Sequence, residues 1–265
     1  MITLAVGCSR STKPGASVDG WTIEHYVGPP SSVGLSTPRL GFAVGFRGTI
    51  LRFDGTSWSD ESGLTMNDLS KVRAVSASEF FAVGSRGTIL RYDGLRWRTT
   101  YTPTSQHLWG VWGASSRDAF AVGEQGTILH WDGGAWRPMV SPSTQDLFDV
   151  WGSSRRDLYA VGDSSLLHFD GNRWERVPSP DMGAAVSVWG SSARDVYVSG
   201  DGGLHHFDGV SWNRVAGIPV CRVVWGRAPD DVFAISGDTE QIYHFDGVNW
   251  SLEFEFSGNR AIGLM

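Results

Sequence analysis

Residues 119–136 read AFAVGEQGTILHWDGGAW, and the pattern in this stretch decides the fold. Two short runs rich in apolar, β-branched and aromatic residues, Ala119–Val122 and Thr127–Trp131, stop at the glycine-containing turns Gly123–Gly126 and Asp132–Gly133. Such runs between tight turns are typical of antiparallel β-strands. The chain shows no sustained helical period of apolar residues with helix caps, so we expect few helices.

This stretch is one copy of a repeat that runs along all 265 residues with a period of about 38 residues. One marker is Ala-Val-Gly or a close variant, which ends at Gly7, Gly45, Gly84, Gly123, Gly162, Gly200 and Gly237. A second is Asp-Gly-x-x-Trp, whose tryptophan stands at Trp58, Trp97, Trp136, Trp174, Trp212 and Trp250. A third, Val-Trp-Gly, centres on Trp112, Trp151, Trp189 and Trp225. This spacing indicates an array of equivalent structural units.

Four short strands in about 38 residues match the size of a β-propeller blade. We therefore expect an all-β fold, a single seven-bladed β-propeller over residues 1–265 with four antiparallel strands per blade. Six continuous blades are expected at about 33–71, 72–110, 111–149, 150–187, 188–223 and 224–260. The seventh is expected to be composite, with its inner strand from 261–265 and its other three strands from 1–32, because each end carries markers that the other lacks.

Three of the units, GFAVGFRGTILRFDGTSW, FFAVGSRGTILRYDGLRW and AFAVGEQGTILHWDGGAW, resemble two related groups of propellers. One is the Asp-box, or bacterial neuraminidase repeat, group. The other is the photosystem II assembly-factor-like group. The texture is most similar to uncharacterised bacterial repeat proteins of the type VWGSS..DVYAVG..GTILH.DG..W. Here Gly follows Asp directly and the Ser that precedes it in a strict Asp box is missing. The resemblance covers essentially the whole sequence and implies a propeller fold.

Composition excludes several classes of protein. The formal net charge of −6 gives no reason to expect a nucleic-acid partner, because such domains usually carry a basic patch. No apolar stretch is long enough for a transmembrane helix. The abundant Gly and 12 of the 13 Trp follow from the repeat, in which Gly marks turns and the recurring Trp is expected to pack neighbouring blades together, whereas Trp109 stands outside the register.

Recurring polar residues are interpreted as structural. Histidine precedes the aromatic residue of the Asp-Gly turn in four units, at His130, His168, His206 and His244. Equivalent places in different blades are spread around a propeller, so these histidines predict strand-surface hydrogen bonds and no metal site. Carboxylates that recur in nearly every unit are likewise unsuited to a unique catalytic pair. We therefore expect no metal, no cofactor and no catalytic residues.

The segments that link one blade to the next vary most, and in a propeller they share a face with the turns between the second and third strands. Those turns are basic in the first two units, at Arg47 and Arg86, and acidic in later ones, as at Glu124 and Asp163. Because binding residues concentrate on loops held by a rigid scaffold, this variable face is the candidate site. Its candidate binding residues are Arg73, Tyr101, His107, Trp109, Phe148, Asp149, Arg222 and Arg260.

We expect a non-enzymatic scaffold that binds a protein partner on this face and is itself a monomer. One alternative is a lectin with several equivalent glycan sites between blades. The resemblance to Asp-box propellers raises a third, a sialidase-like hydrolase. That enzyme would need three converging arginines, for which Arg73, Arg222 and Arg260 are available, with Tyr101 or Tyr26 and Glu24 for the remaining roles. Uneven loops favour the scaffold over the lectin, because equivalent sites would need equivalent loops.

Two cysteines bear on localisation. Leu4–Ser9 resembles a bacterial lipoprotein cleavage box at Cys8, but Gly7 keeps the repeat register, which favours a strand there. Cys221 belongs to a blade that is not adjacent to the composite one, so we expect free thiols. The resemblance implies an extracytoplasmic bacterial protein, periplasmic or secreted, although the sequence shows no complete signal peptide.

Overall fold

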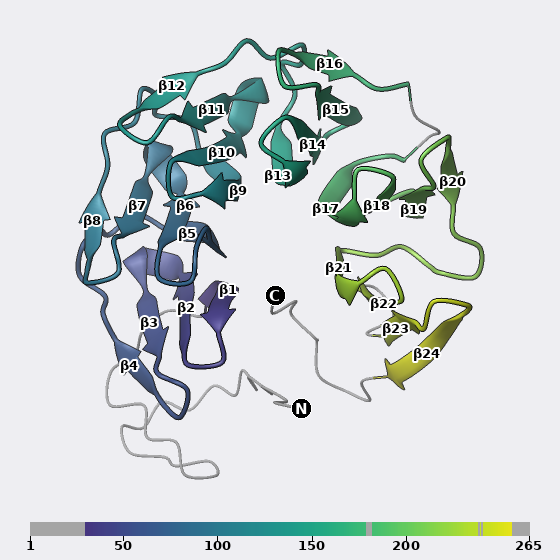
Figure 1. Cartoon of the computed structure of the whole chain (residues 1–265), viewed down its shortest axis with the longest axis horizontal. Coiled ribbons are helices and arrows are strands. Elements are labelled where there is room, and N and C mark those ends of the chain that lie inside the picture. The colour runs from purple at the N-terminus through teal and green to yellow at the C-terminus, as the bar shows by residue number, and fades with distance from the viewer. Residues whose placement is uncertain (1–29, 179–181, 238, 240, 256–265) are drawn as a thin grey trace.

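The computed structural model describes residues 30–178, 182–237, 239 and 241–255 of the protein. These residues form six four-stranded antiparallel sheets, numbered here sheet 1 to sheet 6 in sequence order. Each sheet is built from four strands that are consecutive in sequence and adjacent in space. Figure 1 shows the sheets following one another around a common centre, with sheets 1 and 6 at the two ends of the series.

The first three sheets share one layout, in which a short 3₁₀ turn joins the second strand to the third. Sheet 1 comprises β1 (Pro30–Thr37), β2 (Leu40–Gly45), η1 (Phe46–Gly48), β3 (Ile50–Phe53) and β4 (Trp58–Asp60). Sheet 2 comprises β5 (Leu69–Ala74), β6 (Phe80–Gly84), η2 (Ser85–Gly87), β7 (Ile89–Tyr92) and β8 (Trp97–Thr99). Sheet 3 comprises β9 (Leu108–Ser115), β10 (Asp118–Gly123), η3 (Glu124–Gly126), β11 (Ile128–Trp131) and β12 (Trp136–Pro138).

Sheets 4 and 5 replace the 3₁₀ turn with a connection of two residues, 163–164 and 201–202. Sheet 4 comprises β13 (Leu147–Ser154), β14 (Asp157–Gly162), β15 (Ser165–Phe169) and β16 (Trp174–Arg176). Sheet 5 comprises β17 (Ala185–Ser192), β18 (Asp195–Gly200), β19 (Gly203–Phe207) and β20 (Trp212–Arg214). Sheet 6 comprises β21 (Val223–Ala228), β22 (Asp231–Ser236), β23 (Gln241–Phe245) and β24 (Trp250–Glu255). No helix of the described residues is long and apolar enough to cross a membrane.

The expectation of seven blades is wrong, because the described residues form six sheets. The expected composite blade drew on 1–32 and 261–265, of which 1–29 and 261–265 lie outside the described residues. Residues 30–32 begin β1 of sheet 1. The number of blades was overestimated for a physical reason. Each complete unit specifies its own four strands locally, whereas joining two partial units requires contact between the two termini, which no repeat marker tests. The expectations of an all-β propeller and four antiparallel strands per blade are confirmed.

Aromatic rings pack between neighbouring sheets and supply the largest side chains of a mostly aliphatic core. In sheets 2 to 6 the tryptophan of the Asp-Gly-x-x-Trp marker meets an aromatic residue on the second strand of the preceding sheet, whereas Trp58 of sheet 1 packs on Phe53 of its own sheet. The ring pairs are Trp97–Phe42, Trp136–Phe81, Trp174–Phe120, Trp212–Tyr159 and Trp250–Tyr197, with centroids 4.9, 5.3, 6.4, 5.8 and 6.0 Å apart and near edge-to-face. Edge-to-face pairs of this kind add to the free energy of burying the rings. The predicted role of these tryptophans in packing is confirmed.

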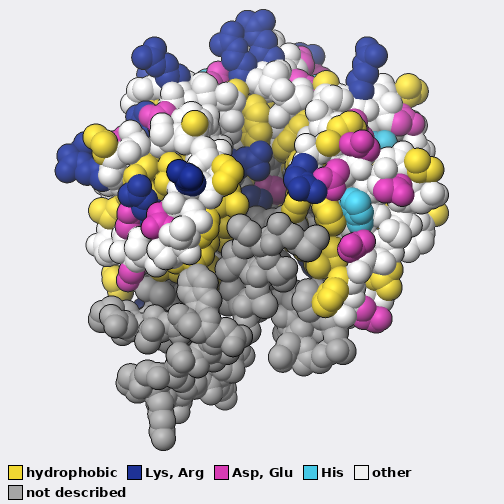
Figure 2. All heavy atoms as spheres, turned by 60° about the horizontal axis from the view of Figure 1, so that its bottom comes forward, with side chains coloured by type: hydrophobic (Ala, Val, Ile, Leu, Met, Phe, Trp, Pro, Cys, Tyr) yellow, Lys and Arg dark blue, Asp and Glu magenta, His cyan; other side chains and the backbone are white. Residues whose placement is uncertain are grey.

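The first strand of each sheet lies innermost, and consecutive first strands contact one another from β1 to β21. Their inward surfaces therefore meet around the centre of the molecule. Figure 2 shows a hollow there, with hydrophobic side chains along its walls and both basic and acidic side chains inside it.

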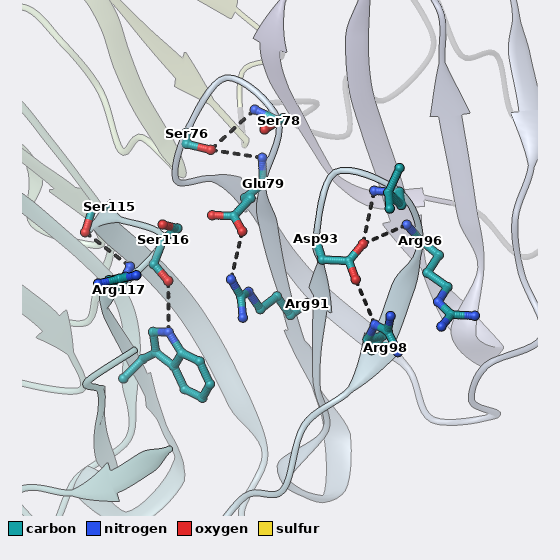
Figure 3. Close-up of polar contacts among 12 residues, drawn as sticks. Ser76, Ser78, Glu79, Arg91, Asp93, Arg96, Arg98, Ser115, Ser116 and Arg117 are labelled. Atoms are coloured by element: carbon teal, nitrogen blue, oxygen red, sulfur yellow. Dashed lines mark hydrogen bonds and ion pairs between the residues drawn. The ribbon is translucent and has the colours of Figure 1, made fainter. Parts of the chain in front are cut away.

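Two sets of turns lie at opposite ends of the strands. At one end, the hairpins between first and second strands lie beside the Asp-Gly turns, and the stem of Arg117, for example, lies against Gly133. In each Asp-Gly turn the Asp side chain accepts backbone N–H groups two and three residues on, as Asp93 does from Leu95 and Arg96 (Figure 3). The hydrogen bond from the Arg98 side chain, together with these two, holds the pKa of the Asp93 carboxyl well below its usual range. We call this end the uniform face.

Each predicted strand-surface histidine bonds to the aspartate that opens the second strand of its own sheet. The Nε2 atoms of His130, His168, His206 and His244 lie 2.9, 2.6, 2.6 and 3.0 Å from carboxylate oxygens of Asp118, Asp157, Asp195 and Asp231. In sheet 2 the same tie is made by Arg91 and Glu79 at 2.7 Å (Figure 3). The prediction that these histidines serve the strands is confirmed, since each is engaged within a single sheet.

Candidate functional site

The other end of the strands carries the variable face, as the sequence predicted. There, in sheets 2 to 5, the turn after the second strand bonds to the linker that enters the same sheet. Ser85 donates its N–H to the carbonyl oxygen of Asp68, Glu124 to that of His107, and Asp163 to that of Asp146, at 2.8 to 3.0 Å. Linkers and turns therefore form one continuous surface around the mouth of the central hollow.

An aromatic cluster of His107, Trp109 and Phe148 lies on this face, where β9 and β13 begin. The rings of His107 and Trp109 stack with centroids 3.6 Å apart and 13° between planes. Phe148 meets the Trp109 ring edge-on, with centroids 6.3 Å apart. All three side chains are only partly buried. Alternation along a strand explains the placement, because Leu108 and Leu147 point into the core and the next residue points away.

His107 occupies a place where the neighbouring linkers have an aspartate. Asp68 and Asp146 precede β5 and β13, and each accepts a backbone N–H from the turn of the preceding sheet, from Arg47 at 2.8 Å and Gln125 at 2.9 Å. His107 precedes β9 but turns its ring toward sheet 2, where Nε2 lies 2.6 Å from Oγ of Ser70. The repeat is thus broken here by a histidine ring that bonds to the neighbouring sheet.

Burial lowers the pKa of His107 below its ordinary value, and the nearby Glu124 and Asp68 carboxylates offset part of that effect. The backbone N–H of His107 donates to Oε2 of Glu124 at 2.9 Å, which fixes the residue at the start of β9. The imidazole is accordingly neutral around pH 7, and it presents a flat apolar surface stacked on Trp109.

Below the aromatic cluster, Lys71 and Asp149 form an ion pair between sheets that are not neighbours. Lys71 on β5 reaches Asp149 on β13, with Nζ 3.1 Å from Oδ1. The equivalent position on the intervening strand β9 is Gly110, since Lys71, Gly110 and Asp149 pair with Val83, Val122 and Val161 of their own sheets. Because Gly110 has no side chain, the Lys71 ammonium group can reach the Asp149 carboxylate across β9.

Asp149 is a buried carboxylate, with 4% of its surface exposed. Besides Lys71, its Oδ1 accepts the N–H of Val150 at 3.0 Å, and its Oδ2 accepts the N–H of Val188 on the next sheet at 3.2 Å. These three donors compensate for the loss of hydration that burial imposes on the charge. Asp149 therefore ties sheets 2, 4 and 5 together at the centre.

Arg73 lies two residues beyond Lys71 on β5 and is exposed. Desolvation by the surrounding protein lowers the pKa of its guanidinium, and the Asp149 carboxylate offsets part of this. The two observations agree for a group that stands in a hollow, where solvent reaches it although protein encloses it. Within the described part of the protein, the guanidinium has neither a hydrogen bond nor an ion pair.

The structure places Arg73, His107, Trp109, Phe148 and Asp149 on the inner strands of sheets 2, 3 and 4 or directly before them, and it leaves Tyr101 and Arg222 apart from them. Tyr101 is 85% exposed in the linker between β8 and β9, and among the described residues it makes no ring contact with the aromatic cluster. Arg222 is paired with Asp201, with Nη1 2.8 Å from Oδ1, between sheets 5 and 6. Arg260 lies outside the described residues.

Sequence reasoning missed Lys71, Ser70 and Gly110. A signal for Lys71 was present, because it is one of only two lysines in the protein and stands in the register of Ser32 and Ser187, which are small. The pairing of Lys71 with Asp149 could not be foreseen, because the two residues are separated by 78 positions and by a whole sheet. Cys221, which lies apart from this site, is a buried free thiol whose pKa burial raises to about 12.

The sequence matches no family model and no curated protein. It is similar to solved structures of propellers at low sequence identity. A structure titled YCF48 bound to D1 peptide has a TM-score of 0.65 and 17% identity, covering 91% of this protein and 82% of that one. YCF48 from Cyanidioschyzon merolae has a TM-score of 0.62 and 17% identity, with coverage of 86% and 87%.

The WD40 β-propeller domain of Doa1 has a TM-score of 0.68 and 10% identity, with coverage of 86% of this protein and 82% of that one. The expected likeness to photosystem II assembly-factor propellers is thus supported by the YCF48 structures. At these identities the likenesses show the fold alone.

Proposed function

We propose that this protein is a non-enzymatic scaffold that binds a polypeptide segment of a protein partner at the mouth of the hollow on its variable face. The observation that carries the proposal is the partly exposed cluster of His107, Trp109 and Phe148. Aromatic residues at the centre of a concave surface are the usual anchors of protein interfaces, because they bury much area at little cost in side-chain entropy.

The repeated tryptophans are poorly placed for a lectin. Trp97, Trp136 and Trp174 are at most 5% exposed, so their rings are committed to packing between sheets. Trp109 differs from them because it stands outside the repeat register and is only partly buried, stacked on His107. A single irregular aromatic site suits one polypeptide partner better than several equivalent sugars. The propeller YCF48, similar in fold, has been solved with a D1 peptide, which supports peptide binding as a use of this architecture.

The test is selection of binding peptides from a random library displayed on phage, followed by affinity measurement with fluorescently labelled peptides. We expect the double variant Trp109→Ala/Phe148→Ala to bind selected peptides at least about tenfold more weakly, which is the usual effect of truncating aromatic anchors. The matched control is Leu95→Ala/Val210→Ala, which removes two apolar side chains, 85% and 89% exposed, from Asp-Gly turns of the uniform face.

Circular dichroism and thermal unfolding of both double variants separate lost binding from lost folding. The proposal fails if no peptide is enriched over an unrelated propeller. It also fails if the control variant weakens binding as much as the variant of the aromatic cluster, because the uniform face would then be the binding surface.

A further inference from the structure

Arg73 breaks the packing rule of the inner strands. In sheets 3, 4 and 5 the residue at this position is a tryptophan whose ring lies over a glycine of the next sheet. A Cβ atom built on Gly152, Gly190 or Gly226 would stand 3.1, 2.6 or 2.6 Å from the ring of Trp112, Trp151 or Trp189. The tryptophans at this position therefore fill the space between sheets.

In sheet 2 that space is filled by another residue. Val75 covers Gly113 of sheet 3 with its methyl groups, where the other sheets use tryptophan. Arg73 is thereby released from packing, and sheet 1 has Gly34 at the same position, so the architecture requires no side chain there. An exposed arginine on an innermost strand that the core does not need calls for a different explanation.

The charges around Arg73 do not balance. Lys71 and Arg73 contribute two positive charges, and Asp149 contributes one negative charge. The Asp149 oxygens already accept bonds from Lys71, Val150 and Val188, which leaves the guanidinium without a partner among the described residues. A partly desolvated cation is costly unless an anion compensates it. The planar fork of a guanidinium matches a carboxylate in two parallel hydrogen bonds.

We propose that Arg73 is a receptor for a carboxylate of the bound polypeptide segment, which enters the central hollow while a neighbouring apolar side chain of that segment rests on the aromatic cluster. This inference rests on the proposed function and adds the chemistry of the partner. The carboxylate can belong to an Asp or Glu residue or to the carboxy-terminal end of the polypeptide. Because Lys71 is already paired with Asp149, Arg73 is the cation that remains for the carboxylate of the ligand.

The first experiment uses a small probe and does not depend on finding a peptide. N-acetylleucine carries a carboxylate and an apolar side chain, and N-acetylleucinamide is the same molecule without the charge. We expect millimolar N-acetylleucine to shift the NMR cross-peak of the Arg73 Nε–Hε group, and the amide to leave it in place. Arg117, on the uniform face, gives the matched reference peak, and Arg117→Gln is the matched variant.

The second experiment uses a peptide selected as described above, prepared with a free or amidated C-terminus and with its acidic side chains intact or replaced by amides. We expect Arg73→Gln to weaken binding of the peptide that keeps all its carboxylates by about tenfold or more, the usual size of a charge-assisted hydrogen bond. If replacing one carboxylate by an amide makes the affinity independent of Arg73→Gln, that carboxylate is the one that Arg73 binds. Arg117→Gln is expected to leave every affinity unchanged.

The outcomes separate this inference from the proposed function. If selected peptides bind through Trp109 but lose nothing on amidation or on Arg73→Gln, the carboxylate receptor is wrong and peptide binding stands. If N-acetylleucine shifts Arg73 while no peptide is enriched, the anion site stands and the proposed function fails. If N-acetylleucine shifts neither arginine, or shifts Arg117 equally, the inference is overturned.

Discussion

At the scale of single residues, the candidate site consists of departures from the repeat. His107 stands where neighbouring units have an aspartate, Lys71 where sheets 1, 3 and 5 have Ser32, Gly110 and Ser187, and Arg73 where sheets 3 to 5 have a packing tryptophan. Gly110 belongs with them, because its missing side chain lets the charges of sheets 2 and 4 meet across sheet 3. Identical units would make a symmetric centre, so each irregularity adds one chemical feature to the mouth of the hollow.

Gly110→Ala tests this arrangement. The new Cβ would stand 2.9 Å from Cα of Asp149, 3.0 Å from Cγ2 of Val122 and 3.1 Å from the carbonyl oxygen of Phe148. Because backbone atoms of β13 must move, we expect the free energy of unfolding to fall by about 1–3 kcal/mol in urea titrations. In Gly134→Ala, the control, the new Cβ meets only Oδ1 of Asp132 at 3.5 Å. Equal stability of the two variants would show that β13 does not need this close approach.

At the scale of elements, sheets 2 to 6 each carry a polar tie between the third strand and the acidic residue at the start of the second strand. Burial alone would raise the pKa of the Asp157 carboxyl, but the hydrogen bonds from His168 and Ser153 outweigh that effect and hold the pKa below its ordinary value of 3.8. Asp195 shows the same balance with His206 and Ser191. The ties recur because the hairpin that carries the aspartate recurs.

These ties predict sensitivity to acid. Because the folded pKa is lowered, the carboxylates stabilise the fold fully above pH 3.8, and this contribution is lost as the pH falls through the lowered value. In that window the unfolded protein binds protons that the folded protein does not. We expect a plot of unfolding free energy against pH to be shallower below pH 3.8 in Asp157→Asn than in the parent protein. Ser153→Ala should lie between them, and an unchanged slope in Asp157→Asn would exclude this source of acid sensitivity.

At the scale of the whole molecule, each sheet is stabilised mainly by its neighbours, so stability should vary along the series. The third strand of sheet 4, β15, is buried at four of its five positions, whereas all five positions of its counterpart β23 in sheet 6 are partly exposed. Segments with less buried apolar surface open locally at lower free energy.

Native-state hydrogen exchange measures this gradient. We expect the amides of Leu166 and Leu167 in β15 to exchange more slowly than those of Ile242 and Tyr243 in β23, which occupy the same strand of the repeat. The matched strands control for position within a sheet. Identical protection in the two strands would mean that the six sheets open only in one global step.

Features of the fold that depend on a few neighbouring residues could be predicted from the sequence, and features that depend on distant contacts could not. Strand runs, Asp-Gly turns and the position of the variable face were all predicted, because turn chemistry and alternation act over a few residues and the repeat states them many times. The packing role of tryptophans such as Trp136 followed from the same repetition. The number of sheets was overestimated, because it depended on joining the two termini and no local pattern reports that contact.

The same distinction between local features and distant contacts applies to the candidate site. By itself the sequence determined which residues break the repeat, and Arg73, His107, Trp109, Phe148 and Asp149 were found in that way. Only the tertiary structure decided which of them meet, and it separated Tyr101 and Arg222 from the rest. It alone paired Lys71 with Asp149, because an interaction between residues 78 positions apart depends on how three sheets pack around one centre.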